Sequence, residues 1–253
     1  LAHSSAANMM MENLGRYGYS YDFISNTTPE DAFRKGMLAF IATLRGIGKA
    51  EQAADLYPAA EQKIRKLYGD TRVAEHLRDA LISTITALLR SFPTDLSPTC
   101  SGVKTATEAL RKDFNNMKRA VSSAVLDKEW KLWQALRDMR LSNRSTKLPD
   151  GYDDLAEQVM SAASALPLHP GPLQDALNHA NTLLQAASEC LAQYAEDKRQ
   201  RGLVDFTDML SDAHQLLCCN KEVLAAFRER IDCLVVDEFQ DTNPLQFSLL
   251  WSL

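Results

Sequence analysis

The chain has 253 residues, which is enough for one large domain or two smaller ones, and 45% of them are apolar, a proportion typical of globular proteins. Its 28 Lys and Arg residues against 33 Asp and Glu residues give a net charge of −5, which excludes a protein that is basic throughout but permits local basic patches. The sequence contains no run of about 18 apolar residues and no basic-then-apolar signal peptide, so neither a membrane span nor a membrane partner is expected.

The five cysteines are odd in number and contain no C-x-x-C pair, which excludes a disulfide framework or a zinc site of the usual spacing. They are Cys100, Cys190, Cys218, Cys219 and Cys233. Reduced thiols are typical of a cytosolic protein. The chain begins with Leu1 rather than Met, which favours a trimmed piece of a longer protein.

Most of the chain has apolar residues at the spacing of one helix face, which predicts a mostly α fold. In chain order, the predicted helical segments are 8–14, 33–44, 77–92, 110–139 and 177–194. Residues rich in Pro, Ser, Thr or Gly interrupt the pattern at 93–102, 148–152 and 166–172, and we expect loops there. Apart from the helical segment at 33–44, the course of residues 20–60 is not predicted.

The pattern changes after Gly202. Residues 204–217 are predicted to form a helix with Asp205 as N-cap and Asp208 at position N3, where a carboxylate favours the positive end of the helix dipole. Cys233–Asp237 is a short apolar run, typical of a strand buried on both faces. A last helix is predicted from Pro244, with Asn243 as N-cap and Gln246 completing a capping box.

The motif that carries chemistry is LVVDEFQD, at residues 234–241. A buried strand that ends in Asp237 and Glu238 would place two carboxylates at the carboxyl edge of a sheet, where α/β folds bind ligands. The first carboxylate suits Mg²⁺, a hard ion that prefers oxygen ligands, and the second can orient or deprotonate an attacking water. Gln240 and Asp241 could sense the γ-phosphate. The alternative is a strand end with solvated acids.

The longer string VDEFQDTNPLQ resembles the Walker B motif of superfamily 1 DNA helicases of the UvrD/Rep type, which include the RecB and AddA nuclease-helicases. Residues 202–210, GLVDFTDML, are similar to the LDFDDLL segment of that family. The resemblance covers roughly residues 190–253. It implies that Asp237 holds Mg²⁺, that Glu238 is the catalytic base, and that Gln240 and Asp241 belong to the same ATP-hydrolysing site.

The resemblance also implies an organisation for the rest of the chain. Ser5–Leu14 is similar to the family segment NKAAxEMxxRL, although Ser5, Met9 and Asn13 replace its usual Lys, Glu and Arg. Residues 1–20 and 196–253 would be parts of a RecA-like α/β P-loop NTPase subdomain, called 1A. Residues 21–195 would be a helical insertion like subdomain 1B.

Two of the family's motifs are missing from the chain. It has no G-x-x-x-x-G-K-[ST] phosphate-binding loop, and none of the family's later arginine motifs follow residue 253. We therefore expect an internal piece of an ATP-dependent 3′-to-5′ helicase or translocase for DNA repair or recombination, inactive alone. The expected partners are single-stranded or tailed duplex DNA, the rest of the helicase chain, and nuclease or repair proteins. The expected compartment is the bacterial cytoplasm, near the nucleoid, or a eukaryotic nucleus.

An alternative is a non-enzymatic helical module that binds DNA or protein and keeps inert helicase motifs. The gene sequence that flanks the chain would distinguish the two, because an upstream phosphate-binding loop supports the helicase. A third possibility is a parent of the RecB or AddA type, in which a nuclease domain follows the helicase.

Residues 104–147 hold eleven Lys and Arg residues against five acids, a local charge of +6 in an acidic chain. Basic residues mixed with aromatic rings are typical of a nucleic-acid surface, since the charges track phosphates and a ring can stack on a base. The candidate DNA contacts are Lys112, Arg119, Lys131 and Trp130. The alternative is a solvated helix whose cations pair with acids at i±4 spacing, with the Trp residues in its core stripe.

Overall fold

The structure is a computed structural model that describes residues 4–15, 17–98, 104–122, 125–144 and 146–253. Cys100 and the end of the predicted loop at 93–102 lie outside these residues. The chain divides into two compact units: unit 1 comprises residues 1–63 and 177–253, and unit 2 comprises residues 64–176. The boundaries predicted for the helical insertion, residues 21 and 195, differ from these division points and stay a prediction. Among the described residues, no helix is both long enough and apolar enough to cross a membrane.

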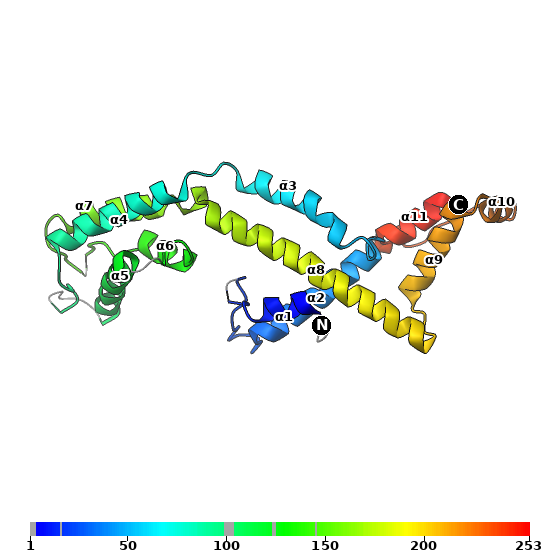
Figure 1. The fold of residues 1–253 in the computed structure, drawn as a ribbon, viewed down its shortest axis with the longest axis horizontal. Helices are drawn as coiled ribbons and strands as arrows, with labels where there is room; N and C mark the ends of the chain where they lie inside the picture. Colours follow the sequence, from blue (N-terminus) through cyan, green and yellow to red (C-terminus); the bar gives the residue numbers. More distant parts are fainter. Residues whose placement is uncertain (1–3, 16, 99–103, 123–124, 145) are drawn as a thin grey trace. The chain divides into compact units, whose positions relative to one another are not determined.

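Unit 1 contains the first two helices of the chain and its C-terminal third (Figure 1). Its elements are α1 (Ser5–Met11), α2 (Pro29–Gly46), the 3-10 turn η1 (Ala54–Leu56), most of α8 (Pro170–Arg201), α9 (Phe206–Cys219), α10 (Lys221–Arg228), the 3-10 turn η3 (Phe239–Asp241) and α11 (Pro244–Ser252). Helix α3 (Tyr57–Tyr68) begins in unit 1 and ends in unit 2.

The core of unit 1 is made by apolar faces of α1, α2 and α8. The predicted face of α2 is confirmed, because Phe33, Met37 and Leu44 are all buried. They pack with Met10 of α1 and with small residues of α8 such as Ala187. Ser4 caps α1 through the Ala7 N–H and donates its hydroxyl to Glu189 Oε2 of α8 at 2.8 Å.

Unit 2 is a bundle of helices around a second core. Its elements are α4 (Ala74–Ser91), α5 (Lys104–Ser122), α6 (Trp130–Arg137), α7 (Tyr152–Ala163) and the 3-10 turn η2 (Leu166–Leu168). The predicted faces of these helices are confirmed at Leu81 and Ile85 of α4 and at Trp133 of α6, each 0% exposed. Helices α4 and α7 run side by side in Figure 1 and pack directly. The helical region predicted over 110–139 is divided into α5 and α6.

The predicted strand at Cys233–Asp237 is not present among the described residues. Residues 233–236 have no regular structure, and Leu234, Val235 and Val236 are 47%, 83% and 38% exposed rather than buried. A strand forms only where a neighbour accepts and donates its backbone hydrogen bonds. In the described ranges, the β pairings are isolated bridges at Asp22–Thr27 and Asn143–Thr146, so nothing there can pair with this segment. The mostly α fold is confirmed, whereas the RecA-like sheet is not seen.

Asp113 is an acidic residue in the interior of unit 2. It is 7% exposed, and its Oδ2 accepts a hydrogen bond from the Arg140 backbone N–H at 2.9 Å. Burial raises the pKa of Asp113 to about 6, against the opposing effects of that hydrogen bond and of the Lys112 and Arg140 charges. Between pH 3.8 and about 6 the folded state keeps a proton that the unfolded state has lost. Stability therefore falls as pH rises through this window.

We predict that Asp113→Asn removes this fall in stability with rising pH. The amide oxygen still accepts a hydrogen bond from the Arg140 N–H, but the side chain carries no charge. Relative to wild type, the variant's free energy of unfolding should increase by up to about 3 kcal/mol between about pH 4 and about pH 8. Urea titrations across this range measure it, with Asp154→Asn, an exposed acid on α7, as the control for charge. Parallel profiles for Asp113→Asn and wild type would contradict the prediction.

Candidate functional site

The acidic segment, residues 237–241, is an exposed turn between residues 233–236 and helix α11. The Glu238 N–H donates to Asp237 Oδ1 at 2.9 Å, and Gln240 Nε2 donates to Glu238 Oε2. Glu238 has φ of 51°, in the left-handed region that a non-glycine residue rarely adopts, which costs on the order of 1 kcal/mol. The local hydrogen bonds therefore hold an unfavourable backbone turn that presents the Glu238 carboxylate beside Asp237.

Three acids of this segment, Asp237, Glu238 and Asp241, line one hollow of about 380 Å³ in unit 1. The other walls are Thr242, Gln246, Leu249 and Leu250 of the following segment and Leu210 of α9. Hard carboxylate oxygens are the ligands that Mg²⁺ takes, and it needs only one or two of them beside phosphate and water oxygens. Within the described ranges, no three His, Cys, Asp or Glu side chains converge as a complete metal site. The donor set therefore fits a magnesium ion that a phosphate ligand brings with it.

Helix α11 directly follows the acidic segment, and its start is fixed as predicted. Asn243 accepts from the Gln246 N–H at 2.8 Å, and the Gln246 side chain accepts from the Asn243 N–H at 2.9 Å, which completes a capping box. Phe239 contacts Phe247 edge to face with the ring centres 5.9 Å apart, and Phe247 stacks on Trp251. These contacts tie the acidic segment to the first two turns of α11.

A second cluster of charges, the carboxylate clamp, comprises Arg45, Tyr194, Lys198, Asp205 and Asp208. Arg45 Nη2 lies 2.6 Å and 2.7 Å from the two Asp205 oxygens and 3.0 Å from Asp208 Oδ1. Lys198 Nζ donates to Asp205 Oδ2 at 3.2 Å and to Asp208, and the Tyr194 hydroxyl donates to Asp205 Oδ2 at 3.0 Å. The clamp thus joins the end of α2, the last turns of α8 and the start of α9.

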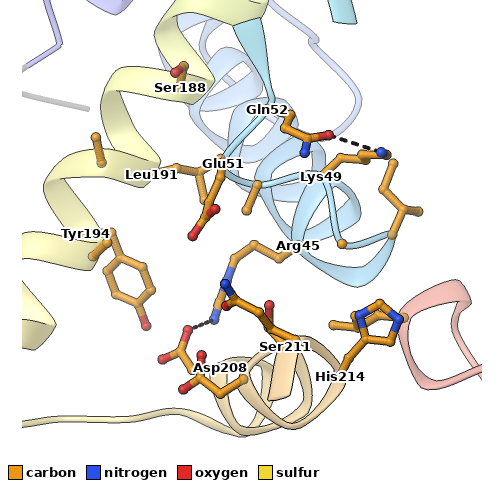
Figure 2. A pocket seen from close by; sticks show the side chains of 18 of the residues that line it. Arg45, Lys49, Glu51, Gln52, Ser188, Leu191, Tyr194, Asp208, Ser211 and His214 are labelled. Carbon is orange, nitrogen blue, oxygen red and sulfur yellow. Dashed lines mark hydrogen bonds and ion pairs between the residues drawn. The ribbon is translucent and has the colours of Figure 1, made fainter. Parts of the chain in front are cut away.

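Figure 2 shows Arg45 extending from α2 toward Asp208, with the Tyr194 ring of α8 beside it. The Arg45 guanidinium also lies 5.4 Å from the centre of the Tyr194 ring, and the Lys198 ammonium 4.3 Å from it. Such cation–π contacts add to the ion pairs. Four clamp residues, Arg45, Tyr194, Lys198 and Asp208, line a hollow of about 680 Å³, in which Lys49 donates to Gln52.

The clamp carboxylates are strongly held in their charged form. Partial burial acts to raise the pKa of Asp205, but hydrogen bonds from Arg45, the Asp208 N–H, Tyr194 and Lys198 outweigh it and hold this pKa well below its usual range. Burial also acts to raise the pKa of Asp208, but the Lys198 hydrogen bond and charge and the Asp205 backbone hydrogen bond together outweigh it and lower this pKa. The pKa values of Arg45 and Lys198 are raised by the same partners against the effect of burial. All four groups are therefore ionised at neutral pH.

Two of the five clamp residues, Asp205 and Asp208, could be placed from the sequence. The predicted N-cap at Asp205 and N3 position of Asp208 are confirmed, and the structure adds a reciprocal capping box in which each side chain accepts from the other's backbone N–H. Arg45, Tyr194 and Lys198 were not predicted as their partners. The sequence does contain one signal for the two cations. Uncharged residues also cap helices well, so two aspartates at the start of α9 indicate a nearby positive charge, although not its position.

The candidate DNA contacts lie on α5 and α6 of unit 2. Lys112 and Lys131 are exposed. Arg119 pairs with Glu129 across the turn between the two helices rather than at i±4 spacing along α5. The Trp130 indole N–H donates to Asp175 Oδ2 at 2.8 Å, and its ring lies 5.0 Å from that of His169. Trp133 is buried and donates to the Leu126 carbonyl.

Three acids of residues 104–147 have partners other than a cation at i±4 spacing. Asp127 accepts from Arg78 of α4 at 3.0 Å, Asp138 pairs with its neighbour Arg137, and Asp113 is buried against the Arg140 backbone. Residues 104–147, the basic segment, are therefore not a helix whose charges cancel along one face.

Comparisons with known proteins agree with the motifs. The UvrD/REP helicase N-terminal domain family matches residues 59–253, more than three quarters of the chain. The chain is 37% identical over 71 residues to DNA helicase II of Escherichia coli (strain K12), covering 28% of this chain and 10% of that protein.

Several helicase/nuclease proteins are also similar. An ATP-dependent helicase/nuclease subunit from Syntrophomonas wolfei is 32% identical over 117 residues, 45% of this chain and 9% of that protein. The corresponding helicase/nuclease subunit from Natranaerobius thermophilus is 34% identical over 73 residues, 29% of this chain and 6% of that protein. The alignments thus span a tenth or less of these relatives. No solved structure matches the chain.

Proposed function

The chain belongs to the UvrD/REP helicase family, and from this premise we propose that it is the part of an ATP-dependent DNA helicase that carries the hydrolytic carboxylates and a helical insertion. The observation that carries the proposal is the acidic segment, whose Asp237, Glu238 and Asp241 line one hollow within the string VDEFQDTNPLQ. The parent moves 3′ to 5′ along single-stranded DNA and acts in DNA repair or recombination.

Four residues of the acidic segment have roles in the proposed hydrolysis. Asp237 holds Mg²⁺, which when bound with ATP neutralises charge on the phosphates. Glu238 accepts the proton of the attacking water as general base. Gln240 orients Glu238 through the hydrogen bond between their side chains, and Asp241, on the same hollow, responds to the γ-phosphate. The left-handed turn at Glu238 supports this assignment, because strained backbone is common where a side chain must be presented to a ligand.

The parent protein supplies the remaining parts. We assign residues 1–20 and 196–253 to a RecA-like subdomain and residues 21–195 to its insertion. The exposed apolar side chains of Leu234, Val235 and Val236 fit a strand that pairs with strands from elsewhere in the parent. The parent protein also supplies the phosphate-binding loop. Several of the similar relatives are named helicase/nuclease subunits, which favours a parent that contains or binds a nuclease.

DNA contacts in unit 2 form the second part of the proposal. Lys112 and Lys131 are exposed within the segment of local charge +6 and suit phosphate contacts, which carry no sequence information. Arg119 would join them by exchanging Glu129 for a phosphate. Stacking of Trp130 on a base requires the indole to give up its hydrogen bond to Asp175, so we assign the ring a packing role first.

We predict that the 253-residue chain alone does not hydrolyse ATP, because it carries no phosphate-binding loop.

We predict that in the full-length parent Glu238→Gln keeps nucleotide binding while turnover falls. The substitution preserves shape but removes the base, whose loss costs on the order of 10²–10⁴ in rate. Asp237→Ala should instead weaken Mg²⁺-dependent nucleotide binding, because it deletes a metal ligand. DNA-stimulated phosphate release and nucleotide titrations measure both effects. Normal turnover of the Glu238→Gln parent would show that the roles are misassigned.

We predict that replacing both Lys112 and Lys131 with Ala weakens DNA binding equally for all sequences. Each phosphate contact that is lost should reduce the slope of log affinity against log salt concentration by roughly one unit. Fluorescence anisotropy with tailed duplexes at several salt concentrations measures the slope. Lys63→Ala combined with Lys66→Ala, on α3, makes the same charge change outside the segment and serves as the control. A folded double variant with unchanged affinity and slope would rule out DNA contact here.

A further inference from the structure

The end of α2 and the starts of α9 and α11 lie close to the acidic segment. A Cβ atom on Gly48, just after α2, would lie 3.3 Å from Leu245 Cδ1, and one on Gly46 would lie 4.0 Å from Asn243 Nδ2. Gly48 has φ of +68°, a conformation that glycine adopts without strain. The end of α2 is therefore in contact with the start of α11, only a few residues after Asp237 and Glu238. Leu245 is buried in this contact, at 4% exposure.

Helix α9 reaches the acidic segment from another side. It packs along α11, and Leu210 lines the same hollow as Asp237 and Glu238. Leu210 follows Asp208 by two residues, within the first turns of α9. A shift of the start of α9 would therefore move a wall of the hollow.

The clamp fixes both of these helices. Arg45 lies in the last turn of α2, and it bonds both carboxylates at the start of α9. The side chains of Arg45 and Lys198 are 19% and 12% exposed, and those of Asp205 and Asp208 are 31% and 27% exposed, so water screens these pairs only partly. All of these Arg45 bonds come from Nη2, so one donor group holds both carboxylates at once.

Helix capping alone does not account for this arrangement. An N-cap needs one acceptor, and Asn or Ser serves as well as Asp. Here both capping carboxylates bond Arg45 of α2 and Lys198 of α8. These two residues lie 160 and 7 positions before Asp205 in the sequence. The additional bonds link α9 to α2, which itself contacts α11.

We infer that Arg45 and Asp205 are positioning residues for the acidic segment: they lock α2 to α9 and so hold α11 and Leu210, and with them Asp237 and Glu238, in the geometry for hydrolysis. Neither residue lines the hollow that those acids form. The inference rests on the proposed function for its effect on turnover, but its effect on the acidic segment is independent of that function.

Hydrogen exchange in the chain itself tests the structural half of the inference. Arg45→Met removes the cation, whereas Asp205→Asn keeps an N-cap and removes only the charge, so it tests the clamp without loss of the cap. Both variants should accelerate amide exchange across residues 238–252 by roughly tenfold. Arg199→Met, which breaks the exposed pair with Glu196 on α8, is the matched control and should leave this region unchanged. Faster exchange confined to α2 and α9 would overturn the inference.

Turnover of the full-length parent tests the functional half. Arg45→Met and Asp205→Asn should lower kcat by roughly tenfold to a hundredfold with little change in KM for ATP, because misplaced catalytic groups cost rate rather than binding. Arg45→Lys should recover part of the loss, since it restores the charge on a shorter side chain without the planar guanidinium.

Glu238→Gln in the same parent separates the two failures. If it abolishes turnover while the Arg45 and Asp205 variants keep wild-type kcat, the positioning inference is overturned and the proposed function stands. If Glu238→Gln keeps normal turnover, the proposed function fails, and the exchange experiment alone decides whether the clamp holds the segment.

Discussion

The pairing of two carboxylates with two cations at the start of α9 is the interaction on which the arrangement of unit 1 depends. Asp205 and Asp208 satisfy backbone N–H groups at the start of α9, and they simultaneously bond Arg45 from α2 and Lys198 from α8. Helices joined only by apolar contact can slide, whereas directed ionic hydrogen bonds fix their register. Since α11 packs on both α2 and α9, the position of the acidic segment is set by charges that lie outside it.

Features that depend on neighbouring residues could be predicted from the sequence. The N-cap at Asp205 and the capping box at Asn243 were predicted because each involves residues three apart or fewer. Buried faces such as Phe33 with Met37 were predicted because helical spacing reveals them. Arg45 was not predicted as a partner of Asp205, because 160 residues separate them and nothing local indicates such a pair. The strand at 233–237 was predicted from its apolar run, but its formation requires partner strands that the described residues do not supply.

The basic segment shows why charge and composition alone do not establish a binding surface. Its excess charge suggested either DNA contact or internal pairing, and the structure divides the residues between other roles. Arg119 and Arg137 pair with acids, Trp130 is held by Asp175, and Lys112 and Lys131 are exposed. The DNA-contact proposal therefore applies to individual side chains rather than to the segment as a whole.

A double-mutant cycle in the free energy of unfolding tests most directly whether Arg45 and Asp205 act as one unit. Urea titrations of the wild-type chain, Arg45→Met, Asp205→Asn and the double variant give the coupling energy between the two side chains. If the clamp operates as described, the coupling should be roughly 1–2 kcal/mol, with the double variant little worse than either single one. Additive effects of the two substitutions would contradict the account.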